Sequence, residues 1–104
     1  MSLRVHFEDA ADVEYRQAGR WYEGRREGLG IEFFDAVDAA IRQIVDLPHI
    51  GVPVPRVPRG LPVRRLAVTR FPYHVVYLET SEAFRILAIA HDRRRPGYWK
   101  SRLR

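Results

Sequence analysis

The side chains best suited to chemistry in this chain are arginine, histidine and tyrosine residues of its second half. They are Arg65, Arg70, His74, His91, Arg93, Arg94 and Tyr98. Histidine exchanges a proton near neutral pH, and arginine neutralises a phosphate without losing its own proton. Such groups suffice for metal-free cleavage of RNA, in which a 2′-hydroxyl attacks the next phosphate and cations stabilise the added negative charge.

Each of these residues also has a purely structural interpretation. A strand histidine is more often packed or hydrogen-bonded than catalytic, and Arg65 and Arg70 also suit the solvated ends of strands. The run Arg93–Arg95 can grip phosphates or the carboxylates of an acidic protein, because a guanidinium forks onto either group. Tyr98 and Trp99 suit stacking on bases or closing the edge of a core.

Composition excludes several other kinds of site. The 104 residues include no cysteine, which excludes disulfides, thiolate nucleophiles and cysteine-bound zinc. The glycines are scattered, and no HExxH or GxSxG motif is present. We therefore expect no metal site and no cofactor. Apolar runs fall short of the roughly 20 residues that a membrane helix needs, so we expect one cytoplasmic domain over residues 1–104 with no membrane contact.

The formal net charge of +5 is divided unevenly along the chain. Residues 1–55 hold six arginines and ten acids, a net of −4, whereas residues 56–104 hold twelve Lys/Arg and three acids, a net of +9. This asymmetry indicates a basic surface presented to a polyanion or an acidic partner, although arginine that merely solubilises the domain is the alternative.

Hydrophobic periodicity predicts the elements that would position these residues. Asp9 offers a carboxylate at the start of the first helix, whose residues Glu14 and Arg16 are expected to face outward. The expected order is a strand at 3–7, helices at 9–28 and 30–47, a proline-rich connector at 48–62, and strands at 63–68, 73–79 and 84–90. The fold class is therefore α+β, with the order β-α-α-β-β-β, an antiparallel sheet and an N-terminal helical hairpin packed on one face.

A two-residue turn at Ser81–Glu82 would fix the register of the last two strands and place Tyr77 opposite Ile86. His74 would then oppose Ile89, with His91 as a diagonal neighbour on the rim of the same face. The face away from the helices would hold His74, Val76, Leu78, Arg85, Leu87, Ile89 and His91. Because this second face is apolar at its centre, it needs a cover from the C-terminal tail, a second copy or a partner chain.

Several motifs, taken in order along the chain, resemble the RelE/ParE toxins of type II toxin-antitoxin modules. They are Trp21-Tyr22-Glu23, Gly28-Leu29-Gly30 with Phe33 and Phe34, the stretch Arg70–Tyr77, and the stretch Ile86–Trp99 that contains His91-Asp92-Arg93-Arg94. The resemblance covers nearly the whole chain. It implies a growth-inhibiting toxin of the plasmid-stabilisation type, silenced by a cognate antitoxin that wraps the open sheet face in a hetero-oligomer.

The resemblance leaves two targets open. ParE-type members poison DNA gyrase without catalysis, whereas RelE-type members cut ribosome-bound mRNA. The RelE pattern implies a catalytic set of Arg65, His74, His91, Arg93 and Tyr98. The apolar second face and the basic tail predict an antitoxin-binding or nucleic-acid-binding set of Arg64, Arg70, Val76, Leu78, Arg85, Leu87, Ile89, Arg94, Arg95 and Trp99.

Departures from the RelE pattern favour the ParE side. His74 stands where RelE-type toxins have an arginine, and Ala67 stands where a second lysine is expected. The long helical hairpin and the ending His91-Asp92-Arg93-Arg94 resemble ParE-type proteins more closely. The sequence thus predicts a ParE-like gyrase inhibitor, with an mRNA endonuclease and a non-toxic basic nucleic-acid-binding domain as alternatives.

Overall fold

A computed structural model describes residues 4–103, and its elements follow the expected order with an added short strand and an added C-terminal 3₁₀ helix. The predicted first strand began at residue 3, which lies outside the described residues. The elements are β1 (Arg4–Phe7), α1 (Asp9–Arg25), α2 (Leu29–Asp46), β2 (Val52–Pro53), β3 (Val63–Ala67), β4 (Tyr73–Glu79), β5 (Ala83–His91) and a 3₁₀ helix (Lys100–Leu103). No helix in this part of the chain is long and apolar enough to cross a membrane.

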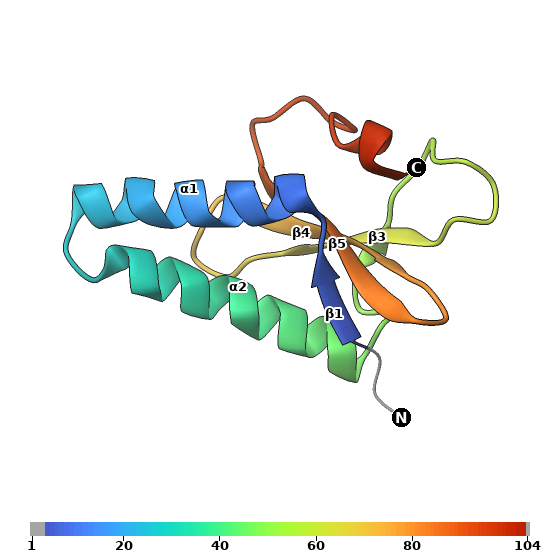
Figure 1. The fold of residues 1–104 in the computed structure, drawn as a ribbon, viewed down its shortest axis with the longest axis horizontal. Helices are drawn as coiled ribbons and strands as arrows, with labels where there is room; N and C mark the ends of the chain where they lie inside the picture. Colours follow the sequence, from blue (N-terminus) through green and yellow to red (C-terminus); the bar gives the residue numbers. More distant parts are fainter. Residues whose placement is uncertain (1–3, 104) are drawn as a thin grey trace.

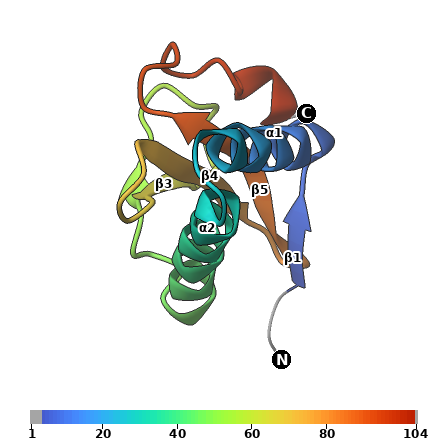
Figure 2. The same ribbon diagram turned by 90° about the vertical axis from the view of Figure 1, so that its left-hand side faces the viewer.

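The helical hairpin packs on one face of the sheet, as predicted (Figures 1 and 2). The α2 side chains Phe33, Val37 and Ile44 are fully buried against it, because they recur at the 3.6-residue spacing of one helix face. The apolar spacing of α2 also predicts Ile31 on this face, but Ile31 is 65% exposed. In Figure 1 the turn between α1 and α2 projects beyond the strands.

The N-cap of the first helix lies one residue earlier than predicted. Glu8 is the N-cap residue and makes no side-chain capping bond, so Asp9 is the first helical residue rather than the cap. The carboxylates of Asp9 and Asp12 still lie in the first turn, where their negative charges stabilise the helix by interacting with the positive end of its dipole.

The sheet is mixed, which corrects the prediction of a wholly antiparallel sheet. Its strand order is β1-β5-β4-β3-β2, and β1 runs parallel to β5. The direction of β1 escaped prediction because two helices, not a hairpin turn, separate it from the rest of the sheet. The two-residue β2 lies at the opposite edge, where Pro53 does not interrupt the hydrogen bonding between central strands.

A β-bulge in the β4–β5 pair corrects the predicted faces. The pairs Glu79–Phe84 and Tyr77–Ile86 form as expected, but the next pair is Val76–Ala88 and Leu87 has no partner residue. After the bulge, the side chains of β5 point to the opposite faces from those predicted. Ile89 therefore packs in the helix-side core and Ala90 packs on the second face. His74 is therefore opposite Ala90 and His91 is opposite Tyr73.

The second sheet face is covered by the chain itself, so the predicted open face is wrong. Side chains of the connector and the tail pack over it, including Val54, Leu61 and Leu103. The apolar residues assigned to partner binding are no more than 3% exposed; they are Val76, Leu78, Leu87, Ile89 and Trp99. The C-terminal tail, one of the three covers considered, shares this face with the connector, and Trp99 of the tail is 3% exposed there.

The connector is fastened to the sheet through the hydroxyl of Tyr77. This hydroxyl donates to the carbonyl oxygen of Pro48 (2.6 Å) and accepts from the amide of Gly51 (3.0 Å). We expect Tyr77→Phe to lower the free energy of unfolding by about 2 kcal/mol, because two inward-facing backbone groups lose their partner. Denaturant unfolding measures this loss. The matched variant Tyr22→Phe, whose hydroxyl makes no hydrogen bond within residues 4–103, should stay within about 0.5 kcal/mol of the parent; equal effects would contradict the account.

Candidate functional site

A hollow of about 490 Å³ lies between the connector and the C-terminal segment, beside the ends of β4 and β5. We call it the cationic hollow. Its lining includes Arg56, Arg65, His74, Arg95 and Lys100, whereas Asp92 is its one carboxylate. Cations from three separate parts of the chain therefore converge on one cavity, a usual arrangement for holding an anion.

His74 is held in the cationic hollow by Asp92. Its Nδ1 lies 3.0 Å from an Asp92 carboxylate oxygen, and the His74 side chain is 18% exposed. A carboxylate accepts hydrogen bonds, so Nδ1 donates to Asp92 and Nε2 is the ring nitrogen that this pair leaves unengaged. The sequence placed His74 at this rim but gave no sign of Asp92 as its partner.

Four of the five residues of the predicted catalytic set line this hollow: Arg65, His74, His91 and Tyr98 do, and Arg93 does not. The backbone amide of Arg93 instead donates to Nδ1 of His91 (3.0 Å). His91 also stacks edge-on against Tyr73, with ring centroids 5.0 Å apart. Arg65 and His74 are therefore the members of the set best placed to meet a ligand.

The hydroxyl of Tyr98 is already engaged. It donates to a carboxylate oxygen of Glu14 at 2.6 Å. Burial, followed by this hydrogen bond, raises the pKa of Tyr98, so the phenol stays protonated and cannot act as a base near neutral pH. The ring is instead a platform, because the Arg94 guanidinium carbon lies 3.8 Å from its centroid.

Glu14 anchors the whole C-terminal segment, although the sequence placed it on the outer face of α1. Its carboxylate also accepts hydrogen bonds from Arg102 (2.9 and 3.1 Å) and from the amide of Ile89 (3.0 Å). Burial alone would lower the pKa of Arg102, but the bond and charge of Glu14 outweigh it and raise that pKa. The hydrophobic periodicity of α1 could not predict this role, because the hydrogen-bond partners of Glu14 lie 75 or more residues away in the sequence.

Three arginines of the predicted binding set hold the fold together. Arg64 donates to the carbonyl oxygen of Gly51 (2.7 Å), and Arg85 bonds the Glu8 carboxylate (3.0 Å) and the Arg102 carbonyl oxygen (3.1 Å). Arg70 pairs with Glu32 at 2.9 Å. The remaining arginines of that set, Arg94 and Arg95, line the cationic hollow.

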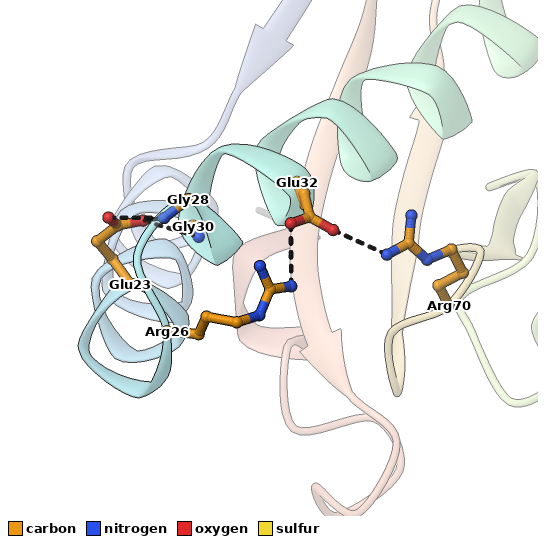
Figure 3. Close-up of polar contacts among 6 residues, drawn as sticks. All are labelled: Glu23, Arg26, Gly28, Gly30, Glu32 and Arg70. Carbon is orange, nitrogen blue, oxygen red and sulfur yellow. Dashed lines mark hydrogen bonds and ion pairs between the residues drawn. The ribbon is translucent and has the colours of Figure 1, made fainter.

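The turn end of the helical hairpin is fixed by two carboxylates (Figure 3). Glu23 accepts hydrogen bonds from the amides of Gly28 (3.0 and 3.1 Å) and Gly30 (3.0 Å) and so neutralises the N-terminus of α2. Glu32 bonds Arg26 (3.0 Å) and also Arg70, which belongs to the turn before β4. The hairpin is thereby tied both to its own turn and to the sheet.

The Glu32 cluster should make stability depend on acid pH. Hydrogen bonds from Arg70 and then Arg26 hold the pKa of Glu32 below its ordinary value of 4.5. A lowered folded-state pKa stabilises the protein above that ordinary value, and the contribution disappears as pH falls through the folded-state value. We expect Glu32→Gln to reduce the loss of melting temperature between about pH 6 and about pH 3. The exposed Glu27→Gln is the matched control, and identical acid profiles for both variants would contradict this role.

A second hollow, of about 550 Å³, lies between α1 and the ends of the central strands. Trp21 forms part of its wall and is 57% exposed, with the Arg25 guanidinium 4.9 Å from its ring centroid. Trp21 is therefore the largest apolar side chain of α1 that still has area to bury against another molecule.

Comparison with known proteins assigns this fold to a class. A structure described as the chromosomal ParDE TA system from P. aeruginosa is similar, with a TM-score of 0.70 and 14% identity, over 86% of this chain and 96% of that one. No curated protein sequence matches this chain. The structural likeness shows that the helical hairpin on a sheet is a fold this chain shares with that protein.

The family follows from the sequence comparison. A family model described as the ParE toxin of the type II toxin-antitoxin system parDE matches residues 5–96. The chain belongs to this ParE toxin family and is the toxin component of a type II toxin-antitoxin module. A cognate antitoxin is therefore its partner.

Proposed function

We propose that this toxin inhibits DNA gyrase and that its antitoxin blocks the inhibition. Membership of the ParE family carries the proposal, because ParE-type toxins are the gyrase poisons of the superfamily that the sequence resembles. The projecting hairpin supports it, since a surface that stands clear of the sheet can enter a cleft of a larger enzyme (Figure 1). Two large apolar residues of the hairpin, Trp21 (57%) and Ile31 (65%), are more than half exposed.

The antitoxin contact needs a surface that the chain does not itself cover. The buried second sheet face offers none, so we place the contact on the exposed basic residues of the C-terminal half, Arg94 and Arg95 among them. Their charge suits an acidic antitoxin segment, since residues 56–104 carry a net of +9.

The proposal is tested by inducing the gene with and without its neighbouring gene while measuring DNA synthesis and mRNA 5′ ends together. Stalled replication with a DNA-damage response, relieved by the neighbour, is the expected result. Growth arrest with intact replication would contradict gyrase as the target. Harmless overexpression would instead favour the non-toxic basic binding domain.

A second candidate function, RNA cleavage, is favoured by one observation, the His74–Asp92 pair. A histidine with a free Nε2 beside Arg65 has the parts of a proton carrier and a phosphate clamp. New cuts at ribosome-positioned sites after induction would support this function, and their absence in His74→Ala would assign it to this pair. An unchanged set of 5′ ends would remove it.

The hairpin contact makes a separate prediction for Trp21. We expect Trp21→Ala to weaken growth inhibition at least tenfold in a dilution assay, because an exposed aromatic anchor typically contributes about 2 kcal/mol to a protein contact. Its melting temperature should change little. Val13→Ala is the control, because Val13 is a 41% exposed apolar residue of the same helix. Full toxicity of Trp21→Ala would exclude this part of the hairpin as the target contact.

A further inference from the structure

The second hollow, between α1 and the ends of the central strands, has hydrogen-bond donors that the fold leaves unused. We call it the α1 hollow. Tyr22 and Tyr73 both line it, and neither hydroxyl makes a hydrogen bond within residues 4–103. No side-chain polar atom in this part of the chain is both fully buried and without a partner, so each hydroxyl still reaches solvent. Burial raises the pKa of both phenols, so they stay protonated near neutral pH and can donate.

Two further donors line the α1 hollow at the end of β5 and just beyond it. The amide of Arg93 donates to Nδ1 of His91, so Nε2 carries the proton of the neutral ring. Arg94 is exposed, and its guanidinium stacks on Tyr98 but makes no hydrogen bond or ion pair with a described residue. His91 therefore adds one N–H donor, and Arg94 adds several together with a positive charge.

The carboxylate of the lining leaves these donors free. Glu14 accepts hydrogen bonds from Tyr98, from Arg102 and from the amide of Ile89. The positive charge of Arg102 balances that of Glu14, which leaves the charge of the neighbouring Arg94 without a counter-ion. An excess of donors beside an uncompensated guanidinium suits a carboxylate ligand.

Exposed apolar surface adjoins these donors. Trp21 lines the same hollow and is 57% exposed, and Pro72, in the turn before β4, is exposed as well. Both residues therefore have area left that a ligand can cover. The volume of about 550 Å³ leaves room for an apolar side chain beside a carboxylate. The chemistry of the hollow thus fits an acidic peptide segment that also carries an apolar residue.

We propose that the α1 hollow is the docking site for such an acidic segment of the antitoxin. A carboxylate of the segment meets Tyr22, Tyr73 and Arg94, and a neighbouring apolar side chain covers Trp21. The antitoxin is the occupant because family membership makes it the partner of this chain. The inference rests on the antitoxin contact proposed above and narrows it to one hollow. Since Trp21 is also the proposed gyrase contact, the two partners compete for one surface.

Calorimetric titration of the full-length toxin with the purified product of the neighbouring gene tests the proposal. We expect Tyr22→Phe and Tyr73→Phe each to weaken binding about tenfold, the effect of losing a hydrogen bond to a charged group. Arg94→Gln should weaken binding to a similar extent. Arg95→Gln removes the adjacent exposed charge, which lies outside the α1 hollow, and should change binding less than about threefold. Melting curves of the two phenylalanine variants should match the parent, because neither hydroxyl bonds another part of the fold.

A double-mutant cycle identifies the docked carboxylate. Each acidic residue of the product is replaced by its amide, and one replacement should weaken binding about tenfold to the parent toxin but only about threefold to Tyr73→Phe, because both changes remove the same contact. Effects that add for every acidic residue would overturn the proposal.

The other outcomes separate the hollow from the broader antitoxin contact. Equal losses in Arg94→Gln and Arg95→Gln would overturn docking in the hollow while leaving a contact with the basic surface in place. A product that does not bind the toxin at all would overturn both. Normal binding of the product by Tyr73→Phe, together with weaker inhibition of gyrase, would assign the hollow to gyrase instead.

Discussion

Gly30→Ala is expected to lower the free energy of unfolding by about 2 to 3 kcal/mol, roughly 10 °C in melting temperature. A Cβ at Gly30 would lie 2.6 Å from the carbonyl oxygen of Gly19, a backbone atom that cannot turn aside. It would also lie 3.0 Å from the Glu23 oxygen that caps α2. The two helices must therefore separate, and the gain in helix propensity from alanine offsets only part of that cost.

The matched control for this variant is Gly24→Ala in α1. A Cβ at Gly24 would have no other atom within 4 Å, so alanine there should be neutral or add up to about 1 kcal/mol. Chemical denaturation of both variants measures the difference. Equal stabilities would show that the close approach at Gly30 does not determine how the helices pack.

Removing the carboxylate of Glu14 should have a comparable effect, because it joins α1 to the C-terminal segment. In Glu14→Ala the Arg102 guanidinium, 19% exposed, and the hydroxyl of Tyr98 both lose a charged acceptor. We expect a loss of about 2 to 3 kcal/mol, since an incompletely buried ion pair costs less to break than a fully buried one. The segment over the second sheet face should loosen before the helical hairpin does.

Tryptophan fluorescence resolves this loosening. The chain has two tryptophans, so in a Trp21→Phe background the signal reports Trp99 alone, which is 3% exposed in the folded protein. Glu14→Ala should shift its emission to the red at denaturant concentrations where far-ultraviolet circular dichroism is still unchanged. Glu27→Ala, which removes an exposed acid of the hairpin turn, should not. Coincident transitions in Glu14→Ala would contradict a separate role for the anchor.

Local signals predicted most of the fold. The 3.6-residue pattern of α2 and the turn at Ser81–Glu82 each act over short distances, and the predicted elements agree with the structure to within a few residues. The bulge at Leu87 was not predictable from the sequence. A strand that is buried on both faces has apolar residues at every position, so its hydrophobic pattern does not distinguish one register from the next. One inserted residue then moved Ile89 to the helix side.

The site was predicted only in part, because its contacts join distant segments. Arg65 and His74 were identified from residue type and strand position, and both line the cationic hollow. Asp92 and Glu14 were missed, since a carboxylate in the sequence does not show which distant cation it meets. Trp99 was wrongly assigned to the binding set. A large aromatic residue suits either a core or a binding surface, and the structure places Trp99 in the core.

The central claim, that this ParE-family chain acts on gyrase, is tested most directly by a supercoiling assay with purified gyrase and relaxed plasmid. We expect the purified protein to block supercoiling or to trap cleaved DNA, Trp21→Ala to weaken this effect at least tenfold, and the neighbouring gene product to abolish it. Unchanged supercoiling at a protein concentration that arrests growth in cells would contradict it.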